Sequence, residues 1–94
     1  MTQNTFASVW DAIEDTAADA ENMRLRSKLM MALKTHLEQK ALNQADAAEL
    51  FGVTQPRVSD LVRGRIQLFG LDTLVNMAAM AGLHFELNIY SVAA

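Results

Sequence analysis

The hydrophobic residues of this chain recur at helical spacing over most of its length. Residues 6–13 place apolar side chains on one face of a short segment whose other face is acidic. A longer helical pattern begins at Thr16, where Thr16 and Asp19 are spaced like the partners of a capping box. Leucines then recur every four residues, at Leu25, Leu29, Leu33 and Leu37. These patterns predict a short amphipathic helix, then a long helix whose leucine face lies in the core.

The stretch from residue 43 to residue 65 predicts two short helices joined by a tight turn. Asn43 and Asp46 have the spacing of an N-cap and its partner, so a helix is expected to begin here. Ala48 is small enough for a second helix to cross close by, and Gly52 can take the positive φ that so short a turn needs. The arrangement is typical of a helix-turn-helix unit, whose second helix enters the major groove of DNA.

The second helix of this unit is expected to begin at Thr54. Because Pro56 has no N–H, the Thr54 hydroxyl is expected to accept a hydrogen bond from the Arg57 N–H. The expected inner face consists of Val53, Val58, Leu61 and Val62. The side chains expected to point outward or sideways are Gln55, Arg57, Ser59, Asp60 and Arg63. Gly64 is expected to end the helix.

The C-terminal part of the chain changes from helical spacing to alternation. Residues 70–81 predict a further helix, and in residues 83–90 the side chains of Phe85, Leu87 and Ile89 alternate with polar ones, as in a half-buried strand. A single strand leaves its backbone N–H and C=O groups unpaired, so a partner strand is required. We expect the same strand of a second copy, antiparallel across a two-fold axis; the alternative is the sheet edge of a different protein.

Together the patterns predict a mainly α fold. We expect a compact bundle of about five helices that contains a helix-turn-helix, with one C-terminal β-strand that pairs across a dimer. Residues 1–16 are expected to form an acidic N-terminal segment, either a short helix or partly disordered. Residues 17–94 are expected to form the DNA-binding domain with its dimerisation strand.

Charge is unevenly distributed along the chain. The formal net charge is −3, but residues 1–22 contain five acidic side chains and no Lys or Arg, which leaves a small positive excess in the rest. A local basic patch can bind phosphates even when the whole chain is acidic. The basic residues of the long helix are expected to be mostly solvated, although Arg26 or Lys34 could reach a DNA backbone.

Composition argues against several other classes of protein. The chain of 94 residues has no cysteine and two isolated histidines, and it contains no Gly-rich phosphate loop. We therefore expect no enzyme, no cofactor and no metal site. No apolar run approaches the length of a membrane span, and the N-terminus has no secretory signal pattern, so a cytoplasmic protein without membrane contact is expected.

The apolar face near the N-terminus has two interpretations. Phe6, Trp10 and Ile13, together with their acidic neighbours, can form a docking segment for a basic partner protein, because aromatic anchors with a charged rim are common at such interfaces. Alternatively, this face packs on the protein's own core.

From Leu25 to about Tyr90 the chain resembles the Cro/C1-type (XRE) helix-turn-helix family, and within it the HigA-like antitoxin branch. The resemblance is carried by LNQADAAELFGVTQPRVSDLVRGR and LFGLDTLVNMAAMAGLHFEL. It implies a dimer that binds a pseudo-palindromic operator in double-stranded DNA and represses its own operon. It also implies an antitoxin that neutralises a small basic, RNA-cleaving toxin of the RelE/HigB-like type. The alternative is a stand-alone or phage-type XRE regulator with no toxin.

The resemblance also implies roles for individual residues. Gln55 is the leading base reader, since an amide can bind adenine in a bidentate manner, while Arg57 could instead read guanine. Ser59 lies farther along the exposed face. The implied phosphate contacts are Gln44, Arg63 and Arg65, and Thr54 is either a phosphate contact or a capping residue.

Two positions depart from the family pattern. Pro56 stands where related repressors often carry a polar base-reading side chain. Asp60 would be repelled by phosphate unless it accepts from a cytosine amine or pairs with Arg57 or Arg63.

Overall fold

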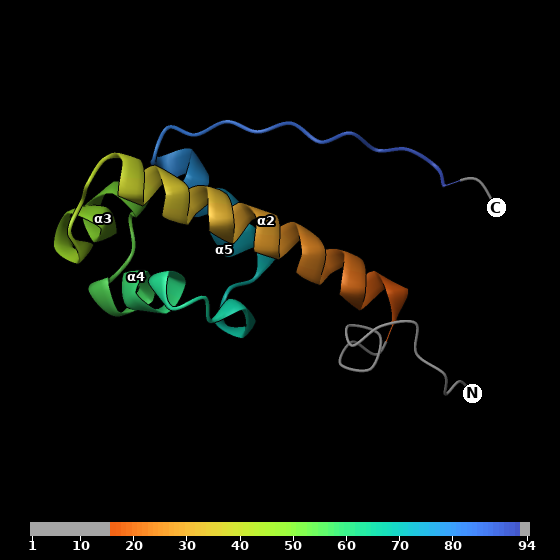
Figure 1. Ribbon diagram of the computed structural model, residues 1–94, viewed down its shortest axis with the longest axis horizontal. Coiled ribbons are helices and arrows are strands. Elements are labelled where there is room, and N and C mark those ends of the chain that lie inside the picture. Colours follow the sequence, from red (N-terminus) through yellow and green to blue (C-terminus); the bar gives the residue numbers. More distant parts are fainter. Residues whose placement is uncertain (1–15, 93–94) are drawn as a thin grey trace.

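The computed structural model describes residues 16–92, which form four α-helices and one 3-10 helix (Figure 1). These are α2 (Ala17–Gln39), α3 (Gln44–Phe51), α4 (Gln55–Val62), η1 (Ile66–Leu68) and α5 (Leu71–Met80). The long helix α2 packs along α5, and α3 contacts both α4 and α5. After α5 the chain runs back, extended, toward the N-terminal end of α2. The mainly helical, compact fold with a helix-turn-helix is therefore confirmed.

The starts of the first three helices follow the predicted capping chemistry. In each case a side-chain oxygen accepts a hydrogen bond from the backbone N–H three residues later. The pairs are Thr16 with Asp19 at 3.0 Å, Asn43 with Asp46 at 2.8 Å and Thr54 with Arg57 at 3.3 Å. Because each cap needs only residues three positions apart, the local sequence is sufficient to specify these helix starts.

The turn between α3 and α4 depends on Gly52. This residue has φ +70°, in the left-handed region that favours glycine. The turn is closed by hydrogen bonds from the Val53 N–H to the Ala48 carbonyl at 3.0 Å and from the Gly52 N–H to the Glu49 carbonyl at 3.3 Å, the pair that defines a Schellman motif. The expected turn geometry is thus present.

A single hydrophobic core joins all four α-helices and the residue that follows η1. Its members are Met30, Leu33, Ala47, Ala48, Phe51, Val58, Leu61, Phe69, Leu74, Met77 and Ala78. In the predicted leucine face of α2, Leu33 is fully buried, while Leu29 and Leu37 pack against the core from its edge. Leu25, in the N-terminal half of α2, is only half-buried and is not part of the core cluster. The core therefore holds α3 and α4 against the C-terminal half of α2.

The predicted inner face of α4 is wrong at one position. Val58 and Leu61 are fully buried, and Val53 is half-buried, but the side chain of Val62 is 39% exposed. Val62 is the last residue of α4, and the chain turns away at Arg63. Because Leu61 in the same final turn is fully buried, Val62 lies at the edge of the buried face of α4.

The predicted C-terminal strand is not formed within residues 16–92. Residues 83–92 are extended but carry no strand pairing, and Ile89 is 90% exposed. One chain supplies one such segment, so no second segment is present to complete a ladder. Four α-helices are described where about five were expected, because the helix predicted at residues 6–13 lies outside the described residues.

Candidate nucleic-acid interface

The helix pair α3–α4 presents its N-terminal ends to solvent. Gln44, the first residue of α3, is exposed, and so are Thr54, Gln55 and Pro56 at the start of α4. The other side of α4 is anchored in the core through Val58. In helix-turn-helix proteins the N-terminal residues of the second helix contact base edges while the first helix crosses the DNA backbone. The exposed ends have the polarity and accessibility for both kinds of contact.

Arg57 is engaged within the chain. Its Nη1 donates a hydrogen bond to the Leu68 carbonyl at 2.7 Å, and its Cζ lies 5.2 Å from the centre of the Phe69 ring. Both contacts hold the guanidinium against the segment that follows α4, and Arg57 is only partly exposed. The family resemblance suggests that Arg57 could read a guanine base, and the sequence does not indicate these contacts within the chain.

The far end of α4 carries the remaining basic residues of the motif. Arg63 is exposed at the C-cap of α4, and the side chain of Arg65 is 53% exposed. The carboxylate of Asp60 lies 3.9 Å from Nη1 of Arg65, so its nearest basic partner differs from the expected Arg57 or Arg63. Ser59 is only half-exposed. Pairing with Arg65 reduces the repulsion that Asp60 would exert on a phosphate.

Arg26 has a role that the sequence interpretation missed. Its Nη1 donates hydrogen bonds to the Ile66 carbonyl at 3.3 Å and the Phe69 carbonyl at 3.4 Å, and its Nε donates to the Asn22 side chain at 2.6 Å. The expectation of a solvated or DNA-facing arginine is therefore wrong: Arg26 is half-buried against the segment that follows α4. The only local signal was the spacing of Asn22 and Arg26, four residues apart on one helix face.

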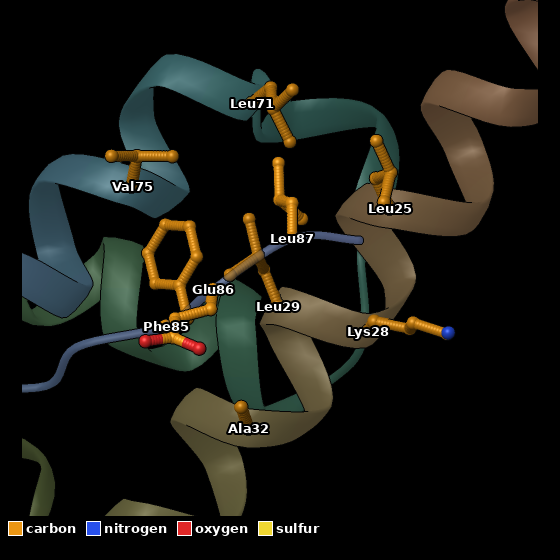
Figure 2. A pocket seen from close by; sticks show the side chains of 9 residues that line it. All are labelled: Leu25, Lys28, Leu29, Ala32, Leu71, Val75, Phe85, Glu86 and Leu87. Atoms are coloured by element: carbon orange, nitrogen blue, oxygen red, sulfur yellow. The ribbon is translucent and has the colours of Figure 1, made fainter. Parts of the chain in front are cut away.

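Two of the three predicted dimerisation residues, Phe85 and Leu87, border an apolar groove of about 250 Å³ between α2, α5 and the C-terminal segment, whereas Ile89 does not line it. Figure 2 shows the Phe85 and Leu87 side chains directed toward Leu71 and Val75 of α5. The groove is lined by Leu25, Lys28, Leu29, Ala32, Leu71, Val75, Phe85, Glu86 and Leu87. Phe85 remains 40% exposed and Leu87 60% exposed, so the extended segment covers the groove only in part.

Two other features are absent from residues 16–92. Within this part of the chain, no group of three or more His, Asp or Glu side chains is arranged to hold a metal ion. No helix of the described chain is long and apolar enough to cross a membrane.

A family model described as a helix-turn-helix domain matches residues 12–90. The chain belongs to this helix-turn-helix family. The match spans the α3–α4 unit and continues through the extended C-terminal segment, which agrees with the geometry described above. Membership suggests a DNA-binding regulator, a class whose members are typically not enzymes. A search of curated proteins finds no significant match.

Proposed function

We propose that this protein is a sequence-specific DNA-binding transcriptional repressor. The observation that carries the proposal is the exposed N-terminal end of α4. Gln55, its first residue, is exposed, while Val58 and Leu61 anchor the helix in the core. An anchored helix can enter the major groove without rearranging the core. The family match supports DNA binding as the general activity.

In this proposal the exposed polar residues divide into base and backbone contacts. Gln55 reads a base edge, with Ser59 farther along the same helix and Arg57 as the alternative reader. Contacts to phosphate come from Gln44, Thr54, Arg63 and Arg65. The exposed basic side chains near the end of α4 support the assignment to the DNA backbone, because they can approach phosphates without any change in the core.

The test is binding of the purified protein to DNA upstream of its own gene, with scrambled DNA of equal length as the control. We expect a clear preference for the upstream DNA and an affinity that falls steeply as salt rises, because phosphate contacts release counterions. Equal affinity for both duplexes, or binding insensitive to salt, would defeat the proposal.

We also propose that the protein works as a homodimer through Phe85, Leu87 and Ile89. The dimer proposal is supported by the extended backbone of residues 84–92, which forms no backbone hydrogen bond with another part of the described chain, and by the three apolar side chains, which are 40% to 90% exposed. A second copy of the same segment supplies both the missing backbone partners and apolar cover. Such a dimer would present two α4 helices to half-sites about 34 Å apart on pseudo-palindromic DNA.

We further propose that the repressor is the antitoxin of a type II toxin-antitoxin pair. The support is the sequence of the acidic segment 1–16, in which Phe6, Trp10 and Ile13 recur at helical spacing among acidic residues, a pattern that suits a small basic partner such as a RelE/HigB-like toxin. These residues lie outside the described part of the chain. The second candidate is a stand-alone or phage-type regulator, favoured by a family match that identifies only a helix-turn-helix domain.

Co-expression with the product of the adjacent gene distinguishes the two candidates. An antitoxin should co-purify with a small basic protein and relieve its toxicity, and Trp10→Ala should weaken that complex while DNA binding is retained. If the adjacent product neither binds nor harms the cell, the stand-alone regulator is the better description.

A further inference from the structure

The segment that joins α4 to α5, residues 65–70, is held by side chains from two different helices. We refer to these residues as the connector. It contains the 3-10 helix η1, whose N-terminus has no side-chain cap, and Leu68 is 49% exposed. Three of its backbone carbonyls nevertheless accept hydrogen bonds from arginines, those of Ile66, Leu68 and Phe69.

The two arginines approach the connector from α2 and α4. Arg26 reaches the Ile66 and Phe69 carbonyls from α2, and Asn22 fixes its Nε from one turn earlier. Arg57 reaches the Leu68 carbonyl from α4 and lies over the ring of Phe69, which is itself fully buried. Hydrogen bonds from a charged donor are stronger than neutral ones, and a guanidinium has several donors in a fixed plane.

Holding the connector has a direct consequence for Arg65. This residue immediately precedes η1; its N–H donates to the Asp60 carbonyl at 3.0 Å, and its Nη1 lies 3.9 Å from the Asp60 carboxylate. The position of Arg65 relative to α4 is therefore fixed on one side by Asp60 and on the other by the following residues of the connector, whose carbonyls bind Arg26 and Arg57.

We propose that Arg26 and Arg57 are positioning residues for DNA binding, which act by holding the connector so that Arg65 meets the DNA backbone beside α4. The inference rests on the proposed DNA-binding function and deepens it. It assigns Arg57 to the protein's own backbone and leaves base reading to Gln55. It also gives Arg26, which lies on a different helix, a part in the same interface.

The decisive experiment is a double-mutant analysis of DNA affinity with Arg57→Met and Arg65→Ala. Because Arg57 acts through Arg65, each single variant should lower affinity by about tenfold, and the double variant should lose little more than either single one. Losses that multiply in the double variant would overturn the proposal, since they would mean that Arg57 contacts DNA independently. Arg26→Met should lower DNA affinity as much as Arg57→Met does. Arg57→Lys should retain part of the affinity that Arg57→Met loses.

Base preference provides a second readout that a simple loss of stability would not change. Selection from a random duplex library should return the same preferred sequence for Arg57→Met as for the wild type, while Gln55→Ala should lose preference at one position. If Arg57→Met instead loses preference at a single base pair, Arg57 is a base reader and the proposal is wrong.

Hydrogen exchange of the DNA-free protein tests the contacts themselves. The amides of Leu68 and Phe69 should exchange faster in Arg57→Met and in Arg26→Met than in Arg65→Ala, while the amides of α3 stay protected in all three variants. Unchanged exchange at the connector would overturn the proposal. Should the wild-type protein bind no duplex, the proposed function fails, and this measurement alone decides whether the arginines hold the connector.

Discussion

Arg57 has two competing uses at the scale of a single residue. A hydrogen bond made by a charged group is worth about 1.5–3 kcal/mol, and an exposed cation–π contact about 0.5–1 kcal/mol. Arg57 would lose both on moving from Leu68 and Phe69 to a guanine, against a gain of about 1–3 kcal/mol from a bidentate base contact. The combined loss of about 2–4 kcal/mol exceeds the gain by about 1 kcal/mol, so the exposed Gln55 is the better candidate for base reading.

Replacement of Gln55 by alanine should therefore affect one base position. We expect Gln55→Ala to reduce discrimination there by about 1–3 kcal/mol, because an amide that binds two atoms of one base is lost. Competition binding with duplexes substituted one base pair at a time measures the effect. Arg65→Ala is the matched control and should weaken binding to all duplexes alike. An equal loss at every position for Gln55→Ala would assign this residue to the backbone.

Ala41 is strained in a way that a substitution can relieve. It has φ +54°, in the left-handed region, at the end of α2, where its N–H donates to the Glu38 carbonyl at 3.0 Å. Ala41→Gly should raise the free energy of unfolding by about 1 kcal/mol, since glycine adopts this conformation without the steric cost of a Cβ. Urea unfolding measures the change. Ala32→Gly, within α2, should lower stability by about 1 kcal/mol, and a loss for both variants would contradict the strain argument.

The capping residues were predictable from the sequence and the two bridging arginines were not, for a physical reason. Asn43 and its partner Asp46 are three residues apart, so spacing alone determines the contact. The Arg57 acceptor lies 11 residues away and the Arg26 acceptors lie 40 and 43 residues away. These acceptors are backbone carbonyls, which every residue has, so no side-chain pattern marks them.

At the scale of the element, hydrophobic spacing identified the helices but not the limits of their buried faces. Val58 and Val62 are four residues apart and share a face by spacing, yet only Val58 is fully buried. Spacing gives the approximate direction of a side chain, whereas burial depends on where the covering elements end around the helix. Leu61 lies in the same last turn and is fully buried, so Val62 is at the edge of the buried face of α4.

This difference within α4 predicts unequal effects of the same substitution. Val58→Ala should lower the free energy of unfolding by about 1–3 kcal/mol, because it leaves a cavity in the core. Val62→Ala should change it by less than about 0.5 kcal/mol, because the side chain is already 39% exposed at the edge of the helix's buried face. Urea unfolding of both variants against the wild type gives the comparison. Similar losses for the two would show that Val62 is covered in solution.

At the scale of the whole molecule, the C-terminal segment is the part whose backbone hydrogen bonding a single chain does not complete. The alternation in residues 83–90 indicated a strand, and the described chain is extended there without a ladder. The period of two is a property of the sequence, but the hydrogen-bond partner has to come from another chain. Extended backbone was thus predictable, while strand pairing depends on what the second chain provides.

Analytical ultracentrifugation of the wild type and of Leu87→Asp tests the proposed dimer. The wild type should sediment as a dimer, and Leu87→Asp as a monomer, because the substitution buries a charge at an apolar interface. Asn88→Asp is the matched control: it adds the same charge one residue later, on the opposite face of the segment, and should stay dimeric. The monomeric variant should also bind palindromic DNA more weakly than the wild type, because it loses the simultaneous engagement of two half-sites. A monomeric wild type, or equal dissociation of both variants, would exclude pairing through the face that carries Phe85, Leu87 and Ile89.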